Sequence, residues 1–432
     1  MYNKFKQHIL KYMDKIHPWL VVLSAASFLF LISILQNIFN SITPYLVEKF
    51  HFSGSEIGFL FGCYYYSNIL FVMLAGILVD KFSVRKLLLV SFIVTNISVL
   101  VFALTKSLTV MALSRLALGI VGSFSGLSYF MLITRWFPAQ KVALVTGIIS
   151  AFMTSGGLVA QAPLVLAIEK LGWCNSLLLN FWVGMLLFLG AFVLLQDFPS
   201  GTKQQITYQK NMISKLTFKQ LIKKIIINPQ NWLIGMFCSL ADLPVLFLGA
   251  SWGNLYLQQT QNLTEIKSSY VTSMIFIGAI IGAPLIGWGS DKFRLRKMPL
   301  IIGTIFVLVT ILPIMYITNL SFITLLILFF IMGVMTSSHV VCYPLVAESN
   351  PKEITGATTG FVASLSAISG VYLYIFSCLM DSAQNHKLDF VASHRLIILV
   401  LLGSIIISLF LALLIKETSC KASPPFAPKR CC

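Results

Sequence analysis

The stretch GILVDKFSVRK at residues 76–86 recurs as GWGSDKFRLRK at residues 287–297. Gly, Asp, Lys, Phe, Arg and Lys stand at the same offset of 211 residues in the two copies. A second, shorter echo pairs Pro138 and Gly147 with Pro351 and Gly360 at an offset of 213 residues. Two matches in the same order predict that the chain contains a duplicated structural unit.

Both copies lie between long apolar stretches in a chain that is poor in charge. Of its 432 residues, 57% are hydrophobic and 10% are charged, and the mean hydropathy is +0.88. Soluble domains carry about a quarter charged residues. The composition therefore excludes a water-soluble globule, a disordered chain and a coiled coil. A β-barrel is not expected, because its strands show short alternating segments rather than continuous apolar runs.

Hydropathy predicts an all-α integral membrane protein with twelve transmembrane helices, each needing roughly 20 apolar residues. The polar segment 197–230 divides them into two sets of six. We expect an amphipathic N-terminus at 1–18, six-helix bundles at 19–196 and 231–415, the central loop at 197–230, and a tail at 416–432. The spans are expected near residues 19–43, 56–79, 87–105, 108–134, 141–167, 173–196, 231–257, 268–290, 298–317, 321–346, 354–379 and 396–415.

The distribution of basic residues predicts the orientation. If both termini are cytoplasmic, 24 of the 31 Lys and Arg residues lie on the inner side and six on the outer side. The positive-inside rule favours that orientation, and it explains the net charge of +17 without a nucleic-acid partner. The basic segments 4–16 and 219–227 are either amphipathic helices on the anionic inner leaflet or solvated tethers. No cleavable signal peptide is expected.

The cysteines indicate neither a disulfide framework nor a metal site. Of the eight, four lie inside predicted spans and only Cys174 lies near the outer face. There is no CxxC pair or Cys/His cluster, so we expect no metal and no cofactor. Cys431 and Cys432 follow Lys429 and Arg430, and cysteines after basic residues can be lipidated. The alternative is that they are incidental, because the chain is already anchored by its helices.

The repeated turn resembles the signature of the major facilitator superfamily, Gly-x-x-x-Asp-(Arg/Lys)-x-Gly-x-Arg-(Arg/Lys), between spans two and three. The resemblance covers residues 18–415, although Ser83 and Arg294 replace the second glycine, which predicts less tight turns. It implies two six-helix bundles related by a pseudo-twofold axis along the membrane normal, with a central cavity between them.

The same resemblance implies a cytoplasmic gate. Asp80 and Asp291 are expected at the inner mouth, each meeting the positive N-terminus of a helix from the other bundle, namely span eleven or span five. The basic residues that follow would hold neighbouring acidic groups, and the glycines would permit close helix approach. The alternative is a pair of ordinary turns. The predicted gate residues are Gly76, Asp80, Arg85, Lys86, Gly287, Asp291, Arg296 and Lys297.

Asp242 is the one acidic residue, of fourteen, that lies well inside a predicted span. A carboxylate there costs roughly 2.5–3.5 kcal/mol on insertion scales, so it should face water or a partner. Pro244 lacks a backbone N–H and would loosen the helix beside it. Asp242 is thus a candidate for substrate binding or proton coupling, with a structural ion pair as the alternative.

Arg115 is the one basic residue inside a span. With Gly119 it resembles the Arg-x-x-x-Gly pattern of the family's fourth helix. A guanidinium can hold a carboxylate bidentately, so Arg115 is a candidate for substrate binding, and a structural or proton-coupling role is the alternative. Further candidates lie on spans one, two, seven and ten: Gln36, Asn40, Tyr65, Asn254, Tyr256 and His339, the last of which can titrate or simply pack.

These features favour a secondary transporter. The chain lacks the Gly-Pro-x-x-Gly-Gly pattern of drug:proton antiporters, which favours uptake. The segment 134–138 and the pairs Gly156-Gly157 and Gly172-Trp173 are similar to bacterial metabolite and organic-anion porters and to the lysosomal dipeptide-transporter branch. We predict proton-driven uptake of an amino acid, small peptide or organic acid. The alternatives are efflux of a drug, siderophore or other metabolite, and a non-transporting sensor or scaffold.

An enzyme is not expected, because the sequence has no HExxH or GxSxG motif and no paired intramembrane carboxylates. The expected partners are a small-molecule substrate, the lipid bilayer and a coupling proton, and no nucleic acid. We expect a monomeric, multi-pass protein of the bacterial inner membrane.

Overall fold

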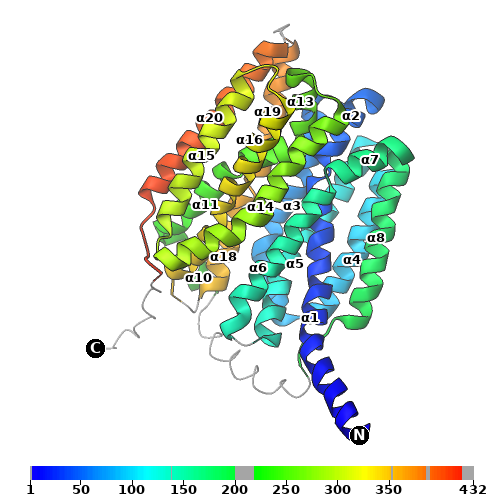
Figure 1. Ribbon diagram of the computed structural model, residues 1–432, viewed down its shortest axis with the longest axis vertical. Coiled ribbons are helices and arrows are strands. Elements are labelled where there is room, and N and C mark those ends of the chain that lie inside the picture. Colours follow the sequence, from blue (N-terminus) through cyan, green and yellow to red (C-terminus); the bar gives the residue numbers. More distant parts are fainter. Residues whose placement is uncertain (1, 138, 200–217, 352–353, 386–389, 421–432) are drawn as a thin grey trace.

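The computed structural model describes residues 2–137, 139–199, 218–351, 354–385 and 390–420 (Figure 1). The side chains of residues 2–16, Gly76, Asp80 and some others within these ranges lie outside the description, as do Cys431 and Cys432. Throughout the described ranges the regular elements are helices.

The first half contains six helical runs, of which the first and fifth are broken. The first break is at Ile38 and the other at Ala160 and Gln161. The helices of this N-terminal bundle are α1 (Tyr2–Asn37) with α2 (Phe39–Phe50), α3 (Gly54–Lys81), α4 (Val84–Leu104), α5 (Leu108–Trp136), α6 (Ala139–Val159) with α7 (Ala162–Leu171), and α8 (Trp173–Leu194).

The second half begins with the short helix α10 (Phe218–Ile227), in which Ile225 packs on Phe361 and Leu365. Its seventh and tenth runs are the most interrupted. The C-terminal bundle comprises α11 (Pro229–Ala241), α12 (Leu243–Val245), the π-helix η1 (Leu246–Ser251) and α13 (Gly253–Gln261); α14 (Glu265–Phe293); α15 (Lys297–Tyr316); α16 (Phe322–Thr336), the 3₁₀ helix η2 (Ser337–Val341) and α17 (Cys342–Glu348); α18 (Thr355–Ser366) with α19 (Ser369–Asn385); and α20 (Phe390–Leu414).

The predicted fold class is confirmed. Among the described residues, ten helical segments are long and apolar enough to cross a membrane, and Leu399–Leu414 is a shorter apolar helix. With α3, which has 28 residues, these segments follow the order of the twelve predicted spans.

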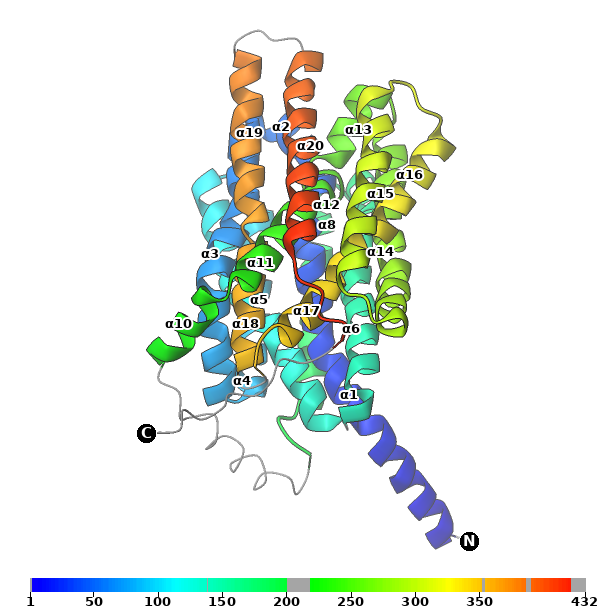
Figure 2. The same ribbon diagram turned by 90° about the vertical axis from the view of Figure 1, so that its left-hand side faces the viewer.

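The two ends of the molecule carry different elements. We call the end with residues 82–83 and 294–296, where the repeated turns lie, the motif end. Helices α2, α7 and α13 lie at the opposite end, whereas α1 begins beyond the motif end (Figures 1 and 2). Every functional feature described below lies at one end or near the middle.

Small residues set the closest helix contacts within each bundle, and they do so at equivalent places. A Cβ atom built on Gly119 of α5 would lie 2.1 Å from the carbonyl oxygen of Tyr64 in α3. A Cβ atom on Gly333 of α16 would lie 2.1 Å from the carbonyl oxygen of Ile275 in α14. Because such close approach requires glycine, the second and fourth spans of each half pack in the same manner, as the duplication predicts.

Glycines also mark the seam between the two bundles. A Cβ atom on Gly157 of α6 would lie 2.5 Å from the ring of Phe276 in α14, and one on Gly370 of α19 would lie 2.1 Å from the ring of Tyr65 in α3. The bundles therefore meet through spans five and eight on one side and spans two and eleven on the other.

Candidate functional site

Asp242 lies at the break in the seventh span, between α11 and α12. The helix resumes through Pro244, which has no N–H to donate, and then widens into the π-helix η1. Local departures of this kind often accompany functional sites. The Asp242 side chain is 25% exposed, so the carboxylate is accessible although it lies near the middle of the molecule.

Two groups from other spans contact this carboxylate. His339 Nδ1 is 3.4 Å from Asp242 Oδ1, and the Ser366 hydroxyl donates to Asp242 Oδ2 at 3.2 Å. His339 Nδ1 also lies 2.8 Å from the carbonyl oxygen of Thr336. A carbonyl oxygen only accepts, so Nδ1 is the donor in this contact. Interruptions in spans seven, ten and eleven thus converge on Asp242.

Tyrosines from both bundles extend this cluster. Tyr343 lies four residues after His339 and is 45% exposed, and Asp242 and Tyr129 of α5 are among the titratable groups near it. Tyr129 is hydrogen-bonded to Ser150 of α6. We call Asp242, His339, Ser366, Tyr343, Tyr129 and Ser150 the central site. The sequence analysis missed the last four, although the spacing of His339 and Tyr343 places them on one helix face.

A second polar cluster lies toward the opposite end. We call Asn40, Gln161, Asn254 and Thr272, all fully buried, the amide cluster. Asn40 Nδ2 donates to Gln161 Oε1 at 2.6 Å, and the backbone N–H of Asn254 donates to Asn40 Oδ1 at 2.8 Å. The Thr272 hydroxyl donates to Asn254 Oδ1 at 2.9 Å.

The amide cluster joins the two bundles. Gln161 Nε2 donates across the seam to the carbonyl oxygen of Gly249 at 2.8 Å, which lies in the π-helix η1. Further hydrogen bonds between the bundles come from this cluster and from the adjacent pair Ala162 and Ser273. The structure therefore has its opposite end closed by neutral hydrogen bonds. Asn40 and Asn254 belong to this closure and not to the central site.

Gln36 and Tyr65 contact each other at the seam. Gln36 Nε2 donates to the Tyr65 hydroxyl at 2.9 Å, and the Tyr65 ring packs on Gly370 across the seam. Tyr65 also interacts electrostatically with Asp242. Tyr256 points elsewhere, since its hydroxyl donates to the carbonyl oxygen of Ile314 inside the C-terminal bundle at 3.4 Å.

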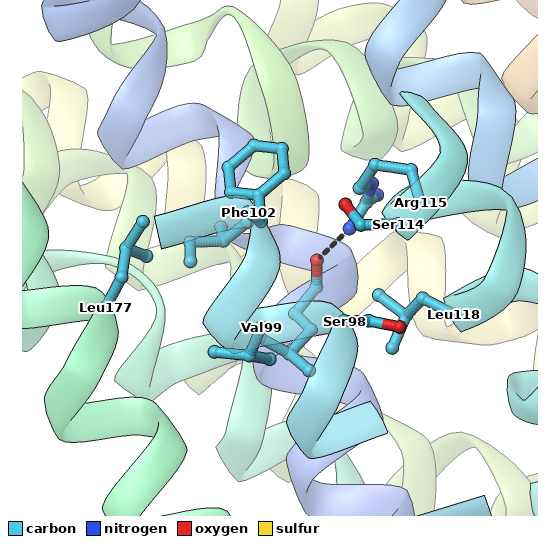
Figure 3. Close-up of a pocket in the computed structure, with 9 residues that line it drawn as sticks. Ser98, Val99, Phe102, Ser114, Arg115, Leu118 and Leu177 are labelled. Atoms are coloured by element: carbon cyan, nitrogen blue, oxygen red, sulfur yellow. Dashed lines mark hydrogen bonds between the residues drawn. The ribbon is translucent and has the colours of Figure 1, made fainter. Parts of the chain in front are cut away.

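Arg115 is enclosed within the N-terminal bundle. It is 4% exposed, Nη1 donates to the carbonyl oxygen of Leu35 at 2.8 Å, and the guanidinium carbon lies 4.8 Å and 5.5 Å from the ring centroids of Phe39 and Tyr64. The side chain borders a small apolar pocket between α1, α4, α5 and α8 (Figure 3). The pocket is lined by Leu35, Ile38, Ser98, Val99, Phe102, Ser114, Arg115, Leu118 and Leu177. Arg115 and Asp242 therefore do not form one site.

At the motif end of the C-terminal bundle, Arg296 is the centre of an ionic network. Its guanidinium contacts Asp291 at 2.7 Å and Glu348 at 2.8 Å. Burial lowers the pKa of the Arg296 guanidinium, but these two carboxylates raise it by a larger amount. Its pKa therefore lies above the ordinary value. The backbone N–H groups of Arg296 and Lys297 both donate to Glu417 at 2.8 Å, and Lys297 Nζ donates to the carbonyl oxygen of Leu413 at 2.6 Å.

The N-terminal bundle repeats this arrangement with fewer charges. Asp197 follows α8 as Glu417 follows α20, and it accepts from the Arg85 backbone N–H at 3.0 Å and from the Ser83 hydroxyl at 2.5 Å. The Arg85 guanidinium donates to the carbonyl oxygen of Phe192 at 2.9 Å. Lys86 is exposed, and its backbone N–H donates to Ser83 Oγ at 3.2 Å.

Apart from the contact between Asp291 and Arg296, no contact is described for the remaining predicted gate residues. Asp291 is 70% exposed, and a Cβ atom on Gly287 would meet nothing within 4 Å. Gly76 and Asp80 lie in α3, with their side chains outside the described set. The contacts given above for Arg85, Arg296 and Lys297 lie within their own bundles.

The two turns differ where the family signature has its second glycine. Ser83 has φ −66° and caps α4 by accepting from the Lys86 N–H. Arg294 has φ +53°, a left-handed conformation that favours glycine, at the end of α14. The first turn is thus an N-cap that needs no glycine, and the second holds an arginine in a conformation that costs roughly 1–2 kcal/mol.

Curated relatives include membrane proteins that sense or carry small solutes. The chain is 24% identical over 368 residues, 81% of each chain, to the membrane sensor protein UhpC of Escherichia coli. It is 22% identical to a probable hexose phosphate transport protein of Chlamydia muridarum, over 60% of this chain and 61% of that one. It is 24% identical to a D-galactonate transporter of Escherichia coli, over 60% and 66%.

Solved structures share the fold at lower identity. A bacterial homologue of the human lysosomal transporter Spinster, inward-facing and occupied, has a TM-score of 0.71 at 14% identity and covers 94% of this chain and 96% of its own. A D-xylose-proton symporter has a TM-score of 0.70 at 15% identity and covers 94% and 99%. Residues 25–374 match the profile of the Major Facilitator Superfamily. The chain belongs to this superfamily of multi-pass transporters, which are not enzymes.

Proposed function

We propose that the chain moves a small polar solute across the bacterial inner membrane by alternating access, with the motif end and both termini in the cytoplasm. The amide cluster closes the end opposite the repeated turns, and this closure supports an inward-facing state. The positive-inside distribution of Lys and Arg supports the orientation, and the missing antiporter pattern supports uptake.

The contact between Asp242 and His339 carries the proposal of proton coupling. The two side chains are 3.4 Å apart and both are partly exposed. Carboxylates and imidazoles are both groups that transporters use to carry protons. The breaks in spans seven and ten provide the local freedom for Asp242 to change partners when it is protonated.

The test is solute flux in proteoliposomes with an imposed pH gradient. Radiolabelled amino acids, dipeptides, sugar acids, sugar phosphates and amines form the panel. We expect gradient-dependent accumulation of at least one solute, and we expect Asp242→Asn to reduce it by about a hundredfold or more. Glu169→Gln removes the same charge from an exposed site at the opposite end and should leave flux unchanged. Gradient-independent flux in the parent protein would contradict proton coupling.

A solute sensor is the second candidate, because the relative matched over 81% of both chains is a membrane sensor protein. A sensor would bind a solute without moving it. If the purified protein is stabilised by a solute that shows no flux in the same proteoliposomes, the sensor is favoured over the transporter.

A further inference from the structure

We propose that the central site selects an organic cation, such as a primary or quaternary amine, and that this cation and a proton compete for Asp242. The inference rests on the proposed function, because it names the solute class for the same site. It comes from the charges that reach the site and from those that do not.

The first step is the absence of an accessible positive group. Arg115 is the one Lys or Arg in the interior of the predicted spans, since Lys141 stands at the first position of the fifth. Its guanidinium is enclosed between Phe39 and Tyr64 and bound to the carbonyl oxygen of Leu35, and its Nε and Nη2 atoms are inaccessible to solvent. An anionic solute therefore finds no guanidinium or ammonium among the described groups around Asp242.

The second step is the charge balance around Asp242 itself. The titratable groups near it are Cys238 on its own helix, Tyr65 on α3, and His339, Cys342 and Tyr343 on the tenth span. Only His339 can become positive, and it then pairs with the Asp242 carboxylate 3.4 Å away. The pair carries no net positive charge while Asp242 is ionised, so an anion would enter an uncompensated, poorly solvated environment.

The third step is the aromatic lining. Tyr343 is 45% exposed. Tyr129, from the N-terminal bundle, is among the groups near it. A tyrosine ring attracts a cation through its negative face, an effect worth up to about 2 kcal/mol where water is excluded. A carboxylate with tyrosines from both bundles suits an ammonium group and gives each bundle a contact with the solute.

This charge class separates the chain from several of its relatives. Transporters of hexose phosphate, D-galactonate and sulfoacetate are among the proteins it resembles. Those three solutes are anions at neutral pH. The central site described here lacks the positive groups that such solutes need, so overall similarity and solute class diverge.

Competition follows from a single carboxylate with two cationic ligands. When an ammonium group binds ionised Asp242, the proton must be absent, and when Asp242 is protonated its attraction for the ammonium group is lost. Cation affinity should therefore fall as the pH falls. Transport by such a site exchanges the cation for a proton, so an inward proton gradient drives the cation outward, which is the efflux alternative and not proton-driven uptake.

The test measures binding to the purified full-length protein in detergent, without any gradient. Melting temperature is recorded against increasing concentrations of phenethylamine, choline and spermidine, and against the anions phenylacetate, glucose 6-phosphate and galactonate. We expect at least one of the cations to stabilise the protein, none of the anions to do so, and the apparent affinity to fall by about tenfold per pH unit once Asp242 begins to be protonated. Asp242→Asn should weaken cation binding by about a hundredfold and abolish its pH dependence.

Control variants separate the charge effect from misfolding. Glu169→Gln has the same change in charge far from the site and should bind as the parent does. Asp242→Glu retains the carboxylate and should recover part of the affinity with its pH dependence. Stabilisation by an anion, or by none of the cations, would overturn the inference. Flux of an anion would overturn the inference but would agree with the proposed transport. Cation binding without flux would support the inference but contradict the proposed transport.

Discussion

The amide cluster and the central site differ in every property that bears on a transport cycle. The amide cluster is fully buried, joins the two bundles, and contains no titratable group. The central site is partly exposed and combines a carboxylate with an imidazole inside one bundle. Opening the opposite end therefore breaks neutral hydrogen bonds, whereas binding of a proton or solute acts about halfway along the molecule. The contacts that close the opposite end are therefore distinct from the groups that bind the proton or the solute.

The largest expected effect comes from wedging the seam that the amide cluster closes. Gly370→Leu and Gly157→Leu would drive a side chain into Tyr65 or Phe276, where even a Cβ atom would lie at 2.1 Å or 2.5 Å. Overpacking of this kind costs typically 1–3 kcal/mol. We expect each variant to favour the state open at the opposite end and to lose transport.

The measurement is labelling of a cysteine reporter at Thr43, a buried position close to the amide cluster, with a membrane-impermeant maleimide from the outside. Gly126→Leu is the matched control, because nothing lies within 4 Å of a Cβ atom there. Equal labelling of all three variants and the parent would show that the seam does not close the opposite end.

Removing one amide should have a smaller effect with the same sign. Gln161→Ala removes the 2.6 Å partner of the Asn40 amide, which keeps only a longer bond to Asn254 Oδ1 at 3.4 Å, and it removes the donor to the carbonyl oxygen of Gly249. Unpaired buried polar groups cost about 1–3 kcal/mol, so labelling at Thr43→Cys should increase roughly tenfold, and should not depend on pH, since the cluster has no titratable member. Asn175→Ala, which loses only a local bond to the carbonyl oxygen of Leu171, should label as the parent does.

The sequence predicted the fold because span length, composition and the repeated turn are local properties. It identified Asp242 and His339 separately, as polar groups in apolar runs. It could not predict their contact, because that contact depends on the interruptions that turn α11 and η2 toward each other. Hydropathy also gives little information about helix rotation in a membrane, since the buried face and the lipid face are both apolar. Arg115 and Asp242 were for that reason both candidates for substrate binding, whereas the structure encloses Arg115 within the N-terminal bundle.

Asn40 and Gln161 illustrate the same limit. They are 121 positions apart, so nothing local pairs them. Pro163 in the first turn of α7 accounts for the break at Ala160 and Gln161, because proline has no N–H to donate, but the break at Ile38 has no glycine or proline beside it. Tyr129 and Tyr343 were missed because an isolated tyrosine in a span gives no signal of which helix it will face.

The motif ends of the two bundles provide a further comparison. Burial raises the pKa of the Glu417 carboxyl, but hydrogen bonds donated by the backbone of Arg296, Lys297, Ser419 and Thr418 lower it more, so its pKa is below the ordinary value. A depressed pKa means that the stabilisation is complete above the ordinary carboxyl pKa and is lost as the pH falls through the folded value. Glu417→Gln should therefore lower the free energy of unfolding by about 0.3–1 kcal/mol at pH 7 and by less at pH 4. Thermal unfolding at the two pH values checks this, and an equal loss at both would contradict an ionic cap.

The smallest expected effect distinguishes the two turns by sign. Arg294→Gly should relieve a left-handed residue at φ +53°, and after the entropy that glycine adds to the unfolded chain we expect a gain of about 0.5 kcal/mol. Ser83→Gly should instead destabilise by a few tenths of a kcal/mol, because Ser83 caps α4 at φ −66° and donates to Asp197. Urea unfolding of the two variants side by side tests the pair. If both substitutions stabilised the protein, or both destabilised it, the different backbone conformations of the two turns would not determine their response to glycine.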